Sequence, residues 1–103
     1  NPYLALGMLI HAGLYGIENR LALPPLVNGD PFLLTDSERS GLGITRLPSS
    51  AAEALNVMLA SEVVTSWMTS DLLNSYVVMR RNEIQEFADL SPEQLVDRYC
   101  HVF

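Results

Sequence analysis

Apolar residues fill the start of the chain so densely that residues 1–17 predict a helix with no polar face. Asn1 suits the cap of that helix, and Pro2 suits its first position, where the missing N–H costs nothing. We expect the helix to end near Arg20, before the prolines at 24–25 forbid its continuation. A helix that is apolar all round is normally buried on every side. We therefore expect the chain to be part of something larger, with this helix in its core.

Residues 24–48 show little periodicity and predict a long irregular loop. The run Asn28-Gly29-Asp30-Pro31 is typical of a turn, and Ser40-Gly41-Leu42-Gly43 is typical of a flexible segment. An irregular segment of this length is uncommon in a compact domain and is usually functional or mobile. We expect it to be the part of the chain that proteases cut most readily.

Helical periodicity returns after this loop and continues to the end of the chain. Ser50 and Glu53 predict a capping box that opens a helix to about Ala60. Further helices are expected from about Glu62, from a cap at Ser70, and from the start signal Ser91-Pro92-Glu93-Gln94. The apolar positions expected to be buried are Ala51, Ala54, Leu55, Met58, Leu59, Val63, Val64, Trp67, Met68, Leu73, Tyr76, Val77, Ile84, Phe87, Leu95, Val96 and Tyr99. No alternating pattern predicts a strand, so the expected fold is mainly α, with four to five helices and a long irregular loop after the first.

The composition indicates that protein, rather than lipid, covers the apolar surface. Hydrophobic residues make up 49% of the chain and charged residues 17%, which is more apolar surface than so small a body readily hides. The first apolar run is shorter than the ~20 residues of a membrane span, and it contains His11 and several glycines. We therefore expect no membrane partner.

Charge and cysteine content bear on the possible partners and on the cellular location. A net charge of −6 makes nucleic acid a poor partner, so none is expected. Cys100 is the only cysteine, which excludes a disulfide within the chain and agrees with a reducing, cytoplasmic location.

Few residues have the types and spacing that a metal site needs. Asp97, Cys100 and His101 share roughly one face of the last helix, but a zinc site needs a further ligand elsewhere. His11 is the only other histidine, and on an apolar helix it is more often a core histidine bonded to a carbonyl or carboxylate. We assign no metal ligand.

Other patterns also have simpler explanations than catalysis. Glu83, Glu86 and Asp89 suggest paired carboxylates, but a solvated acidic edge opposite an apolar face accounts for them. Arg80 lies on the apolar stripe of that helix, where it should meet a buried acid or carbonyl, or extend to solvent. Gly41 and Gly43 lack the following Lys-Ser/Thr of a phosphate loop. The Ala12-x-x-x-Gly16 spacing permits close helix approach but is not specific to membranes. No catalytic, cofactor-binding or metal-binding residue is therefore assigned.

Several segments, taken in order, resemble glutamine synthetases. Residues 1–5, NPYLA, with residues 12–17, AGLYGI, resemble that family's NPYLA…AGL-x-GI segment. The run Leu47-Pro48-x-Ser50-x-x-Glu53-Ala54-Leu55 resembles its LP-x-SL-x-EAL. Residues 76–83 resemble its Y-x-x-x-K-R-x-E, with Arg80 where lysine is common, and residues 93–99 with Phe103 resemble its closing helix and tail. The resemblance covers nearly the whole chain but only the C-terminal quarter or so of such an enzyme.

This resemblance implies an enzyme whose active site, between subunits of a ring, uses ATP and Mg²⁺ or Mn²⁺ to join glutamate to ammonia or another amine. The family's metal-binding and phosphate-binding residues lie before the NPYLA segment, so none is carried onto this chain. The chain would be residues 1–103 of the C-terminal helical part of an α+β catalytic domain, a support that is not catalytic alone. Its partners would be the remaining parent chain and neighbouring subunits of a homo-oligomer. Some members are regulated by adenylylation of a tyrosine, and the nearest counterpart here is Phe32, which lacks the hydroxyl.

One alternative belongs to another class of protein. The chain would then be a free-standing helical interaction module without enzymatic activity, its first helix buried in a partner or a homodimer. A separately made short protein should begin with methionine, so the start at Asn1 favours a piece of a larger ligase.

The resemblance also bears on the last two residues. By analogy with ring-forming members of the family, Val102 and Phe103 would pack against a facing ring or would simply fray.

Overall fold

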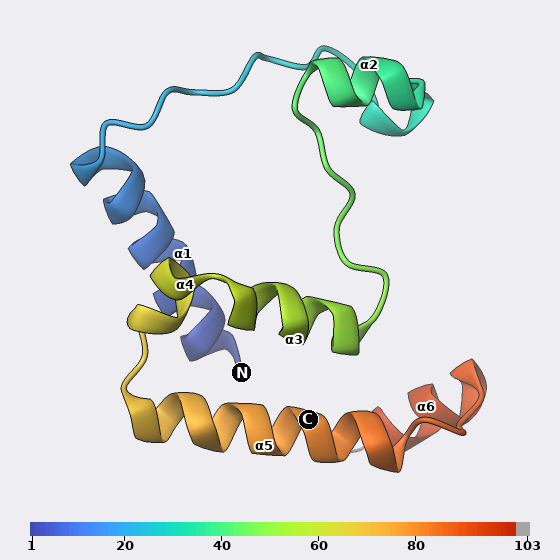
Figure 1. Cartoon of the computed structure of the whole chain (residues 1–103). Coiled ribbons are helices and arrows are strands. Elements are labelled where there is room, and N and C mark those ends of the chain that lie inside the picture. Colours follow the sequence, from blue (N-terminus) through green and yellow to red (C-terminus); the bar gives the residue numbers. More distant parts are fainter. Residues whose placement is uncertain (101–103) are drawn as a thin grey trace. The chain divides into compact units, whose positions relative to one another are not determined.

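The computed structural model describes residues 1–100, and these form six α-helices and one 3₁₀ helix, with no strand among them (Figure 1). The elements are α1 (Pro2–Glu18), η1 (Pro31–Leu33), α2 (Asp36–Gly41), α3 (Ala51–Ala60), α4 (Glu62–Ser66), α5 (Ser70–Glu86) and α6 (Pro92–Tyr99). The expected mainly α class is confirmed. The chain divides into an N-terminal unit, residues 1–47, and a C-terminal unit that begins at Pro48.

Helix α1 begins and ends with local hydrogen bonds. The Asn1 side-chain oxygen accepts from the amides of Tyr3 at 3.0 Å and Leu4 at 3.3 Å, as the sequence predicts. At the other end the Leu21 amide donates to the Gly16 carbonyl at 3.0 Å, and the Arg20 amide bonds to the carbonyl one turn back. This Schellman closure places Arg20 at a φ of 50°, a left-handed conformation that glycine adopts more easily. The helix therefore stops two residues before the expected end.

Within the N-terminal unit the apolar side chains of α1 are exposed or half-buried, and the expected burial of this helix in a larger protein stays a prediction. Tyr3 is 83%, Leu9 70% and Ile17 76% exposed, and α1 has no buried residue. A Cβ atom added at Gly7, Gly13 or Gly16 would meet no atom within 4 Å. The N-terminal unit, taken by itself, therefore does not cover this helix.

The loop that follows α1 is more ordered than the sequence suggested. Its first part is extended, with Leu23 and Leu26 each 93% exposed, and then η1 and the six-residue α2 form. Helix α2 begins with a full capping box, in which Glu38 accepts from the Thr35 amide at 2.8 Å and the Glu38 amide donates to the Thr35 hydroxyl at 3.3 Å. The expectation of one long irregular loop is thus wrong for residues 31–41, because this Thr-x-x-Glu signal builds a short helix that needs no apolar stripe.

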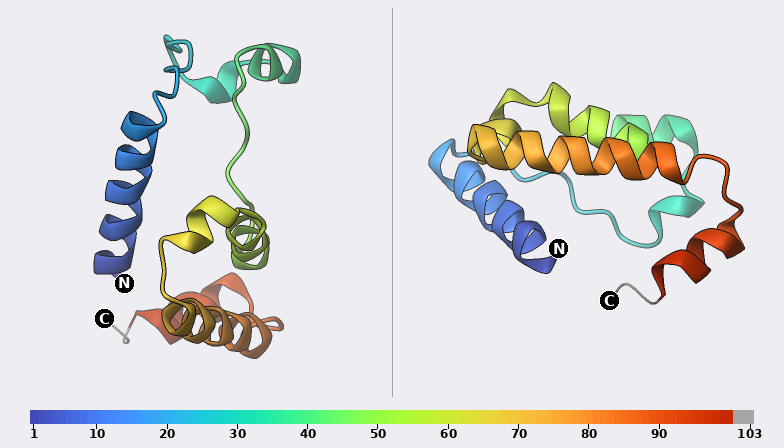
Figure 2. Two further views of the ribbon diagram at one scale, coloured as in Figure 1. Left: turned by 60° about the vertical axis from the view of Figure 1, so that its left-hand side comes forward. Right: turned by 90° about the horizontal axis from the view of Figure 1, so that it is seen from below.

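Helix α3 is the centre of packing in the C-terminal unit. It packs on α4 and on α5, and α3 and α5 run side by side in opposite directions (Figures 1 and 2). Leu55 on α3, at 6% exposure, is the only fully buried residue among residues 1–100. The other apolar positions predicted for a core are only half-buried or exposed, so this unit too has a thin core.

Two helix starts in this unit differ from the expected ones. Ser50 caps α3 as predicted, since its hydroxyl accepts from the Glu53 amide at 3.1 Å. The capping box is only half formed, because the Glu53 carboxylate accepts from the Ser49 amide at 2.7 Å and hydroxyl at 2.8 Å. Helix α5 is capped by Thr69, whose hydroxyl accepts from the Leu72 amide at 3.4 Å, and Ser70 is its first helical residue.

The start of α6 agrees with the sequence. Ser91 and Gln94 form the predicted capping box, and Pro92 occupies the first helical position.

Candidate functional site

A group of polar, apolar and aromatic side chains in the C-terminal unit lines an open cavity of about 340 Å³. Its lining comes from the start of α3, the second half of α5 and α6, and comprises Ser50, Ala51, Ala52, Arg80, Glu83, Ile84, Phe87, Leu95 and Tyr99. Phe87 and Tyr99 meet edge to face, with ring centroids 5.4 Å apart and planes at 72°. This aromatic pair holds α6 against the end of α5.

Arg80 supplies the charge in this cavity. Its Nη1 atom lies 2.7 Å from Glu83 Oε2, and its guanidinium carbon lies 5.6 Å from the centroid of the Tyr76 ring. The Arg80 Nε atom is buried and has no hydrogen-bond partner among the described residues. Of the three alternatives expected for Arg80, the structure shows an acid, although Glu83, its neighbour one turn along α5, is only half-buried.

The three carboxylates considered for acid–base chemistry do not act as a group. Glu83 is 28% exposed and paired with Arg80, so it is not part of a fully solvated edge as expected. Glu86 is exposed and pairs with Arg98 of α6 at 3.3 Å, and Asp89 is exposed beyond the end of α5. The Arg80–Glu83 pair joins two turns of α5, and the Glu86–Arg98 pair joins α5 to α6.

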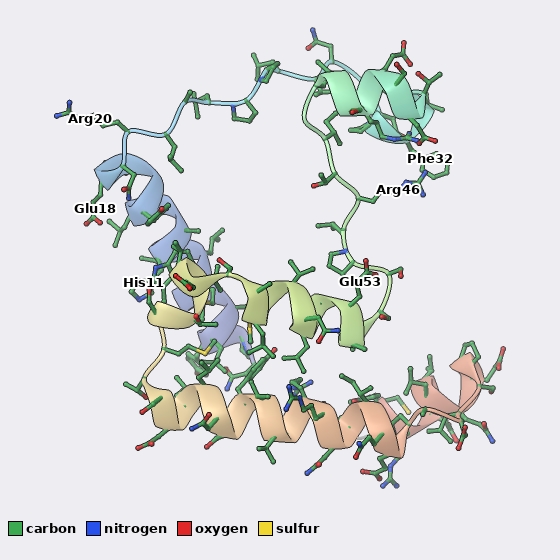
Figure 3. All side chains as sticks on the ribbon, in the orientation of Figure 1. His11, Glu18, Arg20, Phe32, Arg46 and Glu53 are labelled. Atoms are coloured by element: carbon green, nitrogen blue, oxygen red, sulfur yellow. The ribbon has the colours of Figure 1, made fainter. Side chains whose placement is uncertain are left out.

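The residues considered as metal ligands are not assembled into a site by the structure. Cys100 is exposed at the end of α6, and its thiol donates to the Asp97 carbonyl with Sγ 3.2 Å from the oxygen. His101 lies outside the described residues. His11 lies on α1 and is exposed within the N-terminal unit (Figure 3), and its expected place in the core of a larger protein stays a prediction. Within residues 1–100 no three His, Cys, Asp or Glu side chains are grouped as a metal would require.

A second cluster, which the sequence interpretation missed, organises residues 30–44 of the N-terminal unit. The Asp30 carboxylate accepts from the Phe32 amide at 2.9 Å and so caps η1. The Arg39 guanidinium bonds to the carbonyls of Pro31, at 3.4 Å, and Leu34, and it also pairs with the Asp36 carboxylate. The Asp36-x-x-Arg39 spacing, one helix turn apart, was the available signal.

The electrostatics of this cluster follow from those bonds. Hydrogen bonding to Arg39 lowers the pKa of Asp36, and hydrogen bonding to the Thr35 hydroxyl lowers the pKa of Glu38. Both carboxylates therefore stay ionised in acid where free carboxyl groups begin to protonate.

The two glycines considered for a phosphate loop serve the end of α2 instead. Gly43 has a φ of +68°, its amide donates to the Ser40 carbonyl at 3.1 Å, and the Ile44 amide donates to the Arg39 carbonyl at 2.9 Å. This is the Schellman closure again, here with the glycine that the left-handed position favours. Gly41 is the last residue of α2.

Phe32, on η1, is 77% exposed and lies beside α2 (Figure 3). The Arg39 side chain is 13% exposed, and its guanidinium bonds to the carbonyls of Pro31 and Leu34, which precede and follow Phe32 in the chain. The cluster therefore builds a hydrogen-bonded turn with an aromatic side chain on its outside. No helix formed by residues 1–100 is both long enough and apolar enough to span a bilayer.

The sequence of this chain is similar to those of known proteins. Residues 1–99 match the sequence profile of the family described as "Glutamine synthetase, catalytic domain". The glutamine synthetase of Clostridium saccharobutylicum is 36% identical over 103 residues, which are 100% of this chain and 23% of that protein. The glutamine synthetase of Staphylococcus aureus strain MW2 is 32% identical over 99 residues, 96% of this chain and 22% of that protein. The chain thus spans less than a quarter of the length of these curated relatives.

Proposed function

We propose, since this chain belongs to the glutamine synthetase catalytic-domain family, that it is the C-terminal helical support of a glutamine-synthetase-like ligase. In this proposal the parent protein joins glutamate to ammonia or another amine at the expense of ATP. The family match over residues 1–99 supports the assignment, and so does the resemblance of residues 1–5 and 12–17 to the family's NPYLA segment.

The exposed apolar surface of α1 is the observation that carries the supporting role. Large side chains such as Tyr3, Leu9 and Ile17 stand mostly in solvent, and covering each one would stabilise the fold by about 1.5–3 kcal/mol. Upstream parent chain and neighbouring subunits of a homo-oligomer are the proposed cover. The chain matches only 22–23% of the length of its relatives, so a parent of that length would have enough further chain to cover α1.

The proposal assigns no catalytic, nucleotide-binding or metal-binding role to any residue of this chain. By the resemblance, the family's metal-binding and phosphate-binding residues lie before the NPYLA segment. We therefore place ATP and its metal ions on other parts of the parent. Phe32, which has no hydroxyl, also gives no acceptor for adenylylation, so control by that route is not proposed.

The location proposed for the parent is the cytosol. Its supporting observation is the one exposed thiol, Cys100, which is compatible with a reducing compartment.

The first test is the intact mass of the native protein, captured from its source with an antibody to residues 70–103. We expect a mass several times the 11.4 kDa of this chain. A mass near 11.4 kDa would contradict the proposal and favour the free-standing interaction module instead.

The second test is activity. The full-length parent, with ATP, Mg²⁺, glutamate and ammonia, or an alternative amine, should form the γ-amide and release phosphate. The purified 103-residue chain under the same conditions should give background only. Turnover by the chain alone would contradict its supporting role, and a parent inactive with every amine tried would contradict the ligase assignment.

A further inference from the structure

We draw no further inference here: the strongest candidate, the cavity of about 340 Å³ that Arg80, Phe87 and Tyr99 line in the C-terminal unit, carries nothing, because Arg80 is already paired with Glu83, their side chains remain 35% and 28% exposed, and nothing in the structure shows what fills it.

Discussion

The two units of this chain form helices by the same local means but differ in what holds those helices to anything else. In the N-terminal unit, α1 and α2 have complete caps at both ends, while α1 has no buried side chain. In the C-terminal unit, α3 packs on α4 and α5 around Leu55, and the Phe87–Tyr99 contact adds α6. The difference shows that capping decides where a helix begins and ends, whereas its stability comes mainly from the surface it buries.

The strongest test of this comparison makes one substitution in α1 in two proteins, the 103-residue chain and the full-length parent. Leu9, 70% exposed in this chain, should tolerate Leu9→Gln there with a change in unfolding free energy within about 0.5 kcal/mol. In the full-length parent, where we propose that α1 is buried, the same change should cost roughly 2–5 kcal/mol. Chemical denaturation of both proteins measures the two values.

Glu18→Gln, at the exposed end of the same helix, is the matched control and should be nearly silent in both settings. A parent that tolerates Leu9→Gln as well as the control does would show that α1 is not covered there. The proposed supporting role would then fail at its main observation.

In the C-terminal unit the corresponding change should act within the chain itself. Leu55→Ala removes the one fully buried side chain among residues 1–100 and should cost about 2–4 kcal/mol, enough to abolish a cooperative transition in a unit with so thin a core. Leu55→Met, which nearly conserves volume, should cost less than about 1.5 kcal/mol. Urea unfolding followed by circular dichroism at 222 nm measures both.

Val57, also on α3 but 58% exposed, provides the control. Val57→Ala should change the transition by no more than about 0.5 kcal/mol. Equal effects of Leu55→Ala and Val57→Ala would mean that α3 does not pack as described.

The Arg39 cluster tests whether local bonds alone maintain structure in the N-terminal unit. Arg39→Ala removes charge-assisted bonds to two carbonyls and to Asp36, which should cost this segment about 1–3 kcal/mol of local stability. Hydrogen exchange at the Gly43 and Ile44 amides, which close α2, should then speed up about tenfold or more. Arg39→Lys should rescue little, because an ammonium lacks the planar fork that reaches both carbonyls.

Arg46, in the extended segment after α2, is the control for the loss of one positive charge. Arg46→Ala should leave the Gly43 and Ile44 amides unchanged. Equal acceleration in both variants would indicate a general charge effect and would contradict the cluster.

The start of α5 gives a smaller and very specific test. Thr69→Ala removes the hydroxyl that accepts from the Leu72 amide and should cost about 1 kcal/mol. Ser70→Ala, one residue later, should cost nothing and should slightly favour the helix, because alanine has the higher helix propensity. The two variants, compared by thermal unfolding, decide which residue is the cap; a larger loss for Ser70→Ala would reverse the assignment.

Local signals explain how much of the fold could be predicted. The starts of α1 and α6 were predicted correctly because Asn1-Pro2 and Ser91-Pro92 contain both the cap and the first helical residue. The cap of α5 was misplaced by one residue because Thr69 and Ser70 have the same hydroxyl chemistry. Helix α2 was missed because it is short and flanked by glycine and proline, which mask its Thr35-x-x-Glu38 signal.

Burial and pairing were harder to predict, because they depend on neighbours that the sequence of one segment does not identify. The apolar pattern of α1 indicates that this helix must be covered, but it does not identify the segment or chain that covers it. For Arg80 the sequence left an acid, a carbonyl or solvent open, and the pairing with Glu83 depends on side-chain geometry along α5. The family resemblance could be recognised from the sequence, because it rests on the order of short motifs and not on packing.

Acid should produce the smallest effect, and it should act on helix starts in both units alike. The pKa values of Glu38, Glu53 and Glu93 are lowered from the ordinary 4.5, in each case mainly by hydrogen bonds from a serine or threonine at the helix start. A lowered folded-state pKa contributes stability that is present above pH 4.5 and is lost as the pH falls through the lowered value. The first turns of α2, α3 and α6 should therefore loosen as the pH falls below 4.5 and through the lowered pKa values, whereas the cap of α5, the Thr69 hydroxyl, stays neutral throughout. Amide exchange in each first turn, compared between wild type and Glu38→Gln, measures this. The variant should weaken the pH dependence in α2 alone, where Asp36 supplies the remainder. Equal loosening of α5 would show that acid acts on something other than the caps.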